Sequence, residues 1–329
     1  MKQETLKRLF KSIEGDKNDD LVKVALQIIK EEEDKGHTKL SHQLKNILEE
    51  NVHRNEGLKK ELKNIFPNEI PISQRTKSPL VSQISRQDLR HHMILPDIIE
   101  DRFQRIEKEY VARERLAIHG LKPSRKILLY GSPGNGKSMG AERIAWNVGL
   151  PFYKVRFEAL LSSYLGDSLK NLKSIFEIVG GHPSVLLLDE FDFIAKSRSY
   201  TQEVGEMNRI VNLLLYLLDE YDSEGLLIAT TNLETSIDPA IFRRFDEVIE
   251  IGKPSKNEVK ALLKMSLSSM NTSKDISWEK ILNELGNISA AETVKIAQSV
   301  SKLAIMSNEK IINQQHFEKI LKEFNPLKQ

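Results

Sequence analysis

The sequence predicts an α/β fold, in which a domain built on a parallel sheet is followed by a helical domain and preceded by a small N-terminal helical domain. Three observations lead to this prediction. Strand-like apolar runs alternate with helical periodicity in the middle of the chain, a glycine-rich loop joins one such run to a helix, and the β signals end after Pro254. We expect the N-terminal domain over 1–55, a linker over 56–95, the α/β domain over 96–252 and the helical domain over 253–329.

Composition excludes several classes of protein. Lys and Arg number 49 against 47 Asp and Glu, and the formal net charge of +2 gives no general attraction to nucleic acid or to an anionic membrane. The chain has no cysteine, which excludes disulfides, thiolate catalysis and cysteine zinc sites. The first residues contain no apolar core of signal-peptide length, and no window resembles a membrane span. We therefore expect a cytoplasmic protein with no membrane partner.

The first part of the chain is predicted to be helical. Apolar residues recur at i, i+3 and i+4 spacing over 1–55, which is typical of a small helical bundle or of an adaptor that receives a partner. Between 56 and 95 the period fades and three prolines keep the backbone extended, which predicts a linker. Helical periodicity then resumes at Pro96 and ends near Gly120.

The remaining elements follow from apolar period and length. Short apolar runs are typical of strands buried in a parallel sheet, whereas longer segments with a period near 3.6 are typical of helices. The expected strands are 126–130, 151–156, 185–189, 226–230 and 247–251, and the expected helices between them are 136–148, 169–179 and 206–219. The helices expected in the helical domain are 257–270, 278–285, 290–305 and 315–324.

The motif GSPGNGKS follows the first of these strands and indicates a phosphate-binding loop. Its glycines permit backbone torsions that place successive amide N–H groups around a phosphate, and the positive N-terminus of the following helix faces the same point. The lysine supplies charge for the β- and γ-phosphates, and the serine hydroxyl is available to Mg²⁺. The predicted nucleotide-binding residues are Ser132, Pro133, Gly134, Asn135, Gly136, Lys137, Ser138 and Met139.

Two acidic residues end the strand VLLL, at the edge of the sheet where open α/β folds bind ligands. We expect Asp189 to hold Mg²⁺ together with Ser138, and Glu190 to orient or deprotonate an attacking water. An acidic helix cap is the alternative for such a pair, and we assign that role to Asp192.

Polar residues also follow two later elements. Asn232 ends the strand IATT and is suited to holding the attacking water, although a turn residue is the simpler interpretation. Arg243 and Arg244 follow a short helical turn. They are suited to surface ion pairs, or to a neighbouring subunit's phosphate site, where they would offset transition-state charge.

In this order and spacing, GSPGNGKS, LLLDEFD, IATTN and DPAIFRRFD resemble the Walker A, Walker B, sensor 1 and arginine-finger elements of the AAA family of the AAA+ class of ATPases. The resemblance spans about two thirds of the chain. It implies a P-loop nucleotide domain, a helical lid, a homo-oligomeric ring that is usually a hexamer, ATP and Mg²⁺ as cofactors, and ATP-driven remodelling of other macromolecules. It gives ATP and Mg²⁺ handling to Lys137, Ser138, Asp189 and Glu190, sensor 1 to Asn232, and the fingers that act in trans to Arg243 and Arg244.

The resemblance also implies a pore loop and a partner. Tyr164, Leu165 and Gly166 lie where relatives grip a threaded polypeptide, with an ordinary loop tyrosine as the alternative. The closest likeness is to bacterial single-ring AAA proteins often encoded beside a subtilisin-like serine protease, several of which are associated with phage defence. Two departures stand out: the arginines are adjacent, and the sensor 2 region ISAAE contains no arginine.

The main prediction is therefore an ATP-dependent motor that remodels or threads a protein substrate. A nucleic-acid-directed ATPase, such as a loader or a recombination factor, is an alternative that would require a basic groove. A scaffold that uses ATP only as a switch is a third possibility.

Overall fold

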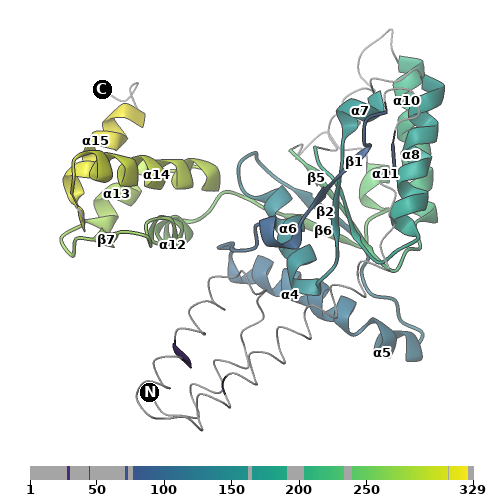
Figure 1. The fold of residues 1–329 in the computed structure, drawn as a ribbon, viewed down its shortest axis with the longest axis horizontal. Helices are drawn as coiled ribbons and strands as arrows, with labels where there is room; N and C mark the ends of the chain where they lie inside the picture. The colour runs from purple at the N-terminus through teal and green to yellow at the C-terminus, as the bar shows by residue number, and fades with distance from the viewer. Residues whose placement is uncertain are drawn as a thin grey trace. The chain divides into compact units, whose positions relative to one another are not determined.

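The computed structural model describes residues 28–29, 44, 71–72, 77–161, 165–190, 204–232, 239–309 and 311–324. The chain divides into two compact units, Met1–Asn68 and Glu69–Gln329. The described residues of the first unit are Ile28, Ile29 and Leu44, all helical, so the N-terminal domain expected over 1–55 lies almost wholly outside the described residues. The account below concerns the second unit (Figure 1).

The second unit contains a six-stranded sheet in the order β1-β3-β4-β5-β2-β6. The five neighbouring strands β3, β4, β5, β2 and β6 pair in parallel, and β1 runs antiparallel to β3 at one edge. This arrangement confirms the α/β class that the alternating pattern predicts. The strands are β1 (Val81–Ile84), β2 (Lys126–Tyr130), β3 (Phe152–Val155), β4 (Val185–Leu188), β5 (Leu226–Thr231) and β6 (Glu247–Glu250).

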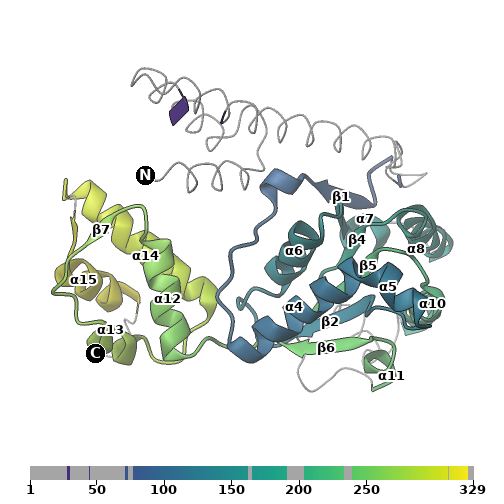
Figure 2. The same cartoon turned by 90° about the horizontal axis from the view of Figure 1, so that it is seen from below.

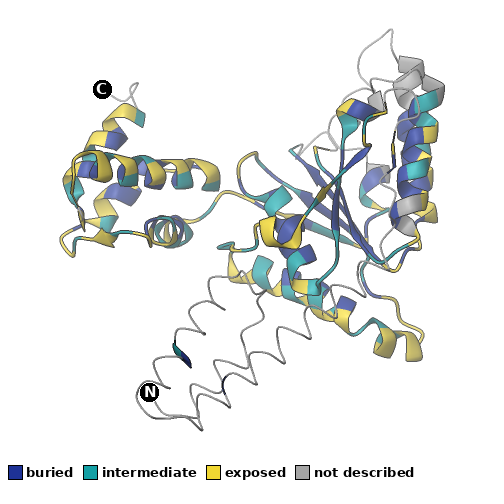
Figure 3. Cartoon of the chain, in the orientation of Figure 1, coloured by how far each residue is buried: buried dark blue, intermediate teal, exposed yellow. Residues whose placement is uncertain are grey.

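Helices cover both faces of this sheet, as Figures 1 and 2 show from two directions. One face carries α4 (Asp97–Val111) and α6 (Lys137–Val148), and α5 (Arg113–Ile118) follows α4. The other face carries α7 (Phe157–Leu161), α8 (Leu165–Gly180), α10 (Val204–Glu220) and α11 (Pro239–Phe242). Because strand side chains alternate between faces, Val185 and Leu187 of β4 pack towards α6, whereas Leu186 and Leu188 pack towards α8 and α10. Figure 3 shows buried residues along the described parts of α8 and α10, which pack against the sheet.

Strand β1 lies in the stretch that the sequence pattern indicates as a linker. Val81 to Ile84 pair with Val155 to Phe152, and the short η1 (Arg86–Asp88) follows. The prolines near this stretch do favour extended backbone, but the antiparallel partner is about 70 residues away in sequence and leaves no local signal. Residues 81–84 therefore belong to the sheet.

The helical domain consists of α12 (Lys256–Ser266), α13 (Trp278–Leu285), α14 (Ala290–Met306) and α15 (Gln314–Phe324), which enclose their own apolar core. Figure 2 shows α12 beside α14. Capping boxes at Ser255 and Ser289 begin α12 and α14. Two short strands, β7 (Asn271–Thr272) and β8 (Ile311–Ile312), pair in parallel. The sequence predicts no strand after 251, since two-residue strands carry no readable period.

Among the described residues, no helix is both long and apolar enough to cross a membrane.

Candidate nucleotide site

The glycine-rich loop joins the end of β2 to the start of α6. Gly131 has a φ of 131° and Gly136 a φ of 94°, torsions that side-chain-bearing residues rarely adopt. A Cβ atom on Gly131 would lie 2.4 Å from the carbonyl oxygen of Ile251, just after β6. Glycine is therefore required at this position by both torsion and space.

Lys137 begins α6 and is buried against the loop that precedes it. Its side-chain Nζ donates hydrogen bonds to the carbonyl oxygens of Gly131 (2.7 Å) and Ser132 (2.9 Å). Only 6% of the residue is exposed, so its ammonium group is held close to the N-terminus of α6, where anions bind.

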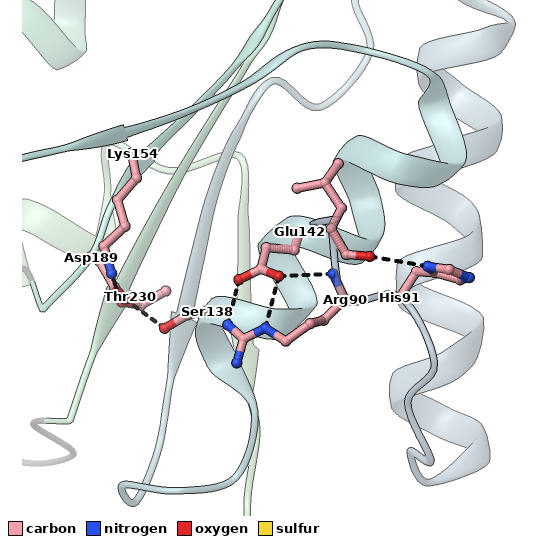
Figure 4. A network of polar contacts seen from close by, with 8 residues as sticks. Arg90, His91, Ser138, Glu142, Lys154, Asp189 and Thr230 are labelled. Atoms are coloured by element: carbon pink, nitrogen blue, oxygen red, sulfur yellow. Dashed lines mark hydrogen bonds and ion pairs between the residues drawn. The ribbon is translucent and has the colours of Figure 1, made fainter. Parts of the chain in front are cut away.

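Asp189 lies at the centre of a polar network with residues of α6, β3 and β5 (Figure 4). Its Oδ1 accepts hydrogen bonds from Ser138 Oγ at 2.7 Å and from Thr230 Oγ1 at 2.5 Å. Its Oδ2 accepts one from Lys154 Nζ at 2.5 Å. The sequence motifs single out Ser138 and Asp189, which the fold brings into direct contact across 51 residues of sequence.

The electrostatics of this network hold Asp189 in its charged form. Burial alone would raise the pKa of this carboxyl group, because a buried charge loses hydration. Hydrogen bonds from Lys154, Thr230 and Ser138 favour the carboxylate and outweigh burial, so the pKa of Asp189 lies below its ordinary value.

Glu190 follows Asp189 directly and has an unusual backbone torsion. Its backbone has a φ of 55°, and its N–H donates to Thr230 Oγ1 at 3.0 Å. A left-handed torsion at a residue other than glycine costs about 1–3 kcal/mol and gathers at functional sites. Glu190 is exposed at the carboxyl edge of the sheet, beside the half-buried Asp189.

Asn232 lies just beyond β5, the strand between β4 and β2. In the sheet register Leu188 is paired with Ala229, and Tyr130 with Thr231. The half-buried Asn232 is therefore at the same edge as Asp189 and the beginning of the loop.

The two arginines differ in their surroundings. Arg244 Nε forms an ion pair with Asp219 Oδ2 of α10 at 3.0 Å, whereas Arg243 is exposed. Asp246 anchors the end of this segment by accepting the backbone N–H groups of Arg125 and Lys126 at 2.8 and 2.9 Å. Arg244 is thus joined to α10 of its own chain.

The sequence motifs miss two cations that flank the Ser138–Asp189 pair, Lys154 and Arg90 (Figure 4). Arg90 donates from its backbone N and from Nε to the buried Glu142 Oε2, each at 2.9 Å, and Glu142 lies one turn after Ser138 on α6. The pKa of Arg90 is raised mainly by its hydrogen bond to Glu142, with a smaller contribution from Asp189. No sequence motif marks either position, because Lys154 lies in a short strand and Arg90 in an irregular segment.

The helical domain contacts the loop through main-chain atoms. The N–H of Ala291 donates to the carbonyl oxygen of Gly134 at 2.8 Å, and the N–H of Ala290 donates to Asn135 Oδ1 at 3.2 Å. Asn135 in turn donates from Nδ2 to Ser132 Oγ at 2.7 Å. These bonds tie the first turn of α14 to the loop without an arginine.

A small pocket lies beside this junction. Loop, helical-domain and preceding-segment residues line it together, and most of its lining is apolar. The lining includes Ile94, Leu95, Pro96, Ile99, Asn135, Ile251 and Ala290.

The predicted pore loop lies only partly within the described residues. Tyr164 lies outside the described residues, and Leu165 and Gly166 are the first two residues of α8. Asp192, assigned to a helix cap, also lies outside them.

Comparison with known proteins agrees with this geometry. Residues 127–253 match the model of the ATPase family associated with various cellular activities (AAA). An uncharacterised AAA family ATPase, y4kL of Sinorhizobium fredii, is 32% identical over 97% of this chain and 94% of its own length. A proteasome-activating nucleotidase of Methanosarcina mazei is 29% identical over 68% of this chain and 55% of its own length. A cell division cycle protein 48 homologue of Archaeoglobus fulgidus is 38% identical over 51% of this chain and 23% of its own length. With its loop, its acidic strand end and a relative matched along nearly the whole chain, this protein belongs to the AAA family of ATPases.

Proposed function

We propose that this ATPase acts as a ring, hydrolyses Mg²⁺-ATP at the seams between its subunits, and uses the energy to remodel protein substrates. The observation that carries the proposal is the contact between Ser138 and Asp189, which joins the phosphate loop to the acidic end of β4 and leaves Glu190 exposed beside it.

The residues at this junction fit a magnesium ion. Mg²⁺ prefers oxygen ligands and binds through one or two carboxylates together with substrate phosphates. Ser138 Oγ and Asp189 supply an alcohol oxygen and a charged carboxylate that lie 2.7 Å apart. We expect these two residues to hold the ion. When bound, it would neutralise charge on the phosphate chain.

The pocket beside the loop suits the base of the nucleotide. An aromatic base gains free energy from contact with apolar side chains such as Ile94, Ile99 and Ile251. Because Asn135 belongs to the loop, a base in this pocket would leave its phosphates directed along residues 131–138.

Glu190 and Asn232 are the groups that we assign to water. Glu190 is exposed at the strand end, and its carboxylate is free to accept a proton from a water that attacks the γ-phosphate. Asn232 follows the adjacent strand and would orient the same water with its amide.

Arg243 and Arg244 are assigned to a neighbouring copy. Arg243 is exposed and Arg244 is bound to α10, which supports a role outside the pocket of their own chain. An arginine supplied in trans is worth about 10³ to 10⁵ in rate, so each subunit would depend on its neighbour. Such a head-to-tail contact closes into a ring, for which we propose six subunits.

The proposed substrate class rests on similarity. Relatives are named for activating proteasomes, which supports a protein substrate and a protease as partner, and we propose a subtilisin-like serine protease for the latter. We expect Tyr164, Leu165 and Gly166 to grip the polypeptide. A phage-defence role is part of this proposal.

Mixing two inactive variants tests the shared site. Glu190→Gln lacks the base but retains its arginines, whereas the double variant Arg243→Ala, Arg244→Ala lacks the arginines but retains its base. Each should be inactive alone. In rings assembled from equal amounts of the two variants, about a quarter of the seams would combine an intact base with intact arginines. ATP hydrolysis should therefore recover to about a quarter of the activity of the unaltered protein.

Native mass spectrometry should first establish that the mixed rings form. Mixed rings without recovery of phosphate release, or full activity of the double variant alone, would refute hydrolysis at a shared seam. As a matched control, Arg115→Ala removes an exposed arginine elsewhere in the same domain.

A further inference from the structure

Lys154 makes a contact with Asp189 that the assigned roles do not explain. It lies on β3, which pairs in parallel with β4, and the register sets Lys154 opposite Leu187, two residues before Asp189. Its Nζ lies 2.5 Å from Asp189 Oδ2. The Lys154 side chain is 42% exposed and the Asp189 side chain 11%, so the ammonium reaches the carboxylate from the solvent side.

The network divides the two oxygens of Asp189 between different partners. Ser138 and Thr230, which are neutral, occupy Oδ1, whereas the single positive charge of Lys154 occupies Oδ2. A divalent cation near Ser138 would draw on the same carboxylate, directly or through one of its water ligands. Two cations at one carboxylate repel each other, since an opposite charge within 4–6 Å stabilises the carboxylate but a like charge destabilises its neighbour.

We infer that Lys154 is a displaceable counter-ion of Asp189 that competes with the magnesium ion of Mg²⁺-ATP and thereby sets the metal concentration at which the site fills. The inference rests on the proposed metal site at Ser138 and Asp189. It assigns Lys154 a regulating position rather than a catalytic one.

The partners of the two cations, rather than their exposure, explain why Lys154 would be the one that is displaced, since the Arg90 side chain is 62% exposed and that of Lys154 42%. The other nearby cation, Arg90, is held by several hydrogen bonds to the buried Glu142. Lys154 has a flexible side chain that is nearly half exposed, so it would return to water at little cost. Arg90 would therefore remain in place while Lys154 is displaced.

The test measures metal binding without hydrolysis. The probe is a fluorescent ADP analogue bound to the full chain, and its affinity is recorded while the Mg²⁺ concentration is varied. Lys154→Gln should reach the half-maximal effect at about tenfold less Mg²⁺ than the unaltered protein, the lower end of the effect of one nearby charge, because Lys154 is partly exposed. Lys154→Arg keeps the charge and should behave as the unaltered protein.

Two further variants complete the experiment. Lys280→Gln removes a lysine from an exposed ion pair with Glu318 in the helical domain and should leave the Mg²⁺ dependence unchanged. Asp189→Asn should abolish most of that dependence. If Asp189→Asn alters the dependence but Lys154→Gln does not, or shifts it to more Mg²⁺, the competition is refuted and the metal site stands. If Asp189→Asn leaves the dependence unaltered, the metal site itself is refuted.

Discussion

Replacing Gly131 by alanine should destabilise the α/β domain by about 2–5 kcal/mol. The φ of 131° at Gly131 accounts for about 1–3 kcal/mol of this, since side chains rarely adopt it. The new Cβ would also lie 2.4 Å from the carbonyl oxygen of Ile251. Relief of that clash would separate β2 from the end of β6 and weaken the bond from Ile251 N to Tyr130 O, now 2.7 Å long, at a cost of about 1–2 kcal/mol.

Urea unfolding followed by tryptophan fluorescence would measure this loss. The chain has 2 tryptophans, so a Trp278→Phe background leaves Trp146 of α6 as a reporter of the α/β domain. With a slope of about 2 kcal/mol per molar, the midpoint should fall by about 1–2.5 M. The matched control is Gly252→Ala, where an added Cβ meets nothing within 4 Å and the change should stay below about 1 kcal/mol. Equal midpoints for the two variants would refute the steric reasoning.

Three further predictions follow from the site and the core. Glu190→Gln should bind ATP as before but lose at least about 100-fold in turnover, because the base is gone; radiolabelled phosphate release measures it, and ordinary turnover would contradict the assignment. Asp219→Ala should reduce turnover by about tenfold without changing ATP affinity, because Arg244 loses an ion-pair partner, whereas Asp222→Ala, which alters an exposed residue just after α10, should not. Burial raises the pKa of Tyr221 to about 12, above the ordinary value of 10.0; stability is therefore complete below pH 10 and declines as the pH rises towards 12, and Tyr221→Phe should remove that alkaline decline in thermal melts. An unaltered alkaline decline in that variant would contradict the role of burial.

Much of the α/β domain could be predicted from the sequence because its signals are local. The apolar run before Asp189 and the glycine pattern before Lys137 each report on a few adjacent residues, and the parallel sheet brings them together at one edge. The contact between Ser138 and Asp189 follows from that topology.

The remaining features depend on pairings that leave no local pattern. Strand β1 pairs with β3, which is far away in sequence. Lys154 looks like an ordinary strand residue in the sequence, and its contact with Asp189 becomes visible only when β4 lies beside β3. The difference between Arg243 and Arg244 likewise depends on Asp219, a residue of another helix. Such relations are set by tertiary contacts, which a single sequence does not display.

The bonds between α14 and the loop have a consequence for how they can be detected. Both donors are main-chain N–H groups of alanines, so alanine scanning of α14 cannot remove them, and most other substitutions at these two positions leave the amides intact. Proline is the side chain that deletes an amide hydrogen. Ala290 is the first residue of its helix, where proline is well tolerated, and Ser289 before it already has the extended torsions, φ −77° and ψ 163°, that precede proline. Ala290→Pro would therefore remove one of the two hydrogen bonds while sparing the helix, and it would reveal coupling that alanine scanning of α14 leaves undetected.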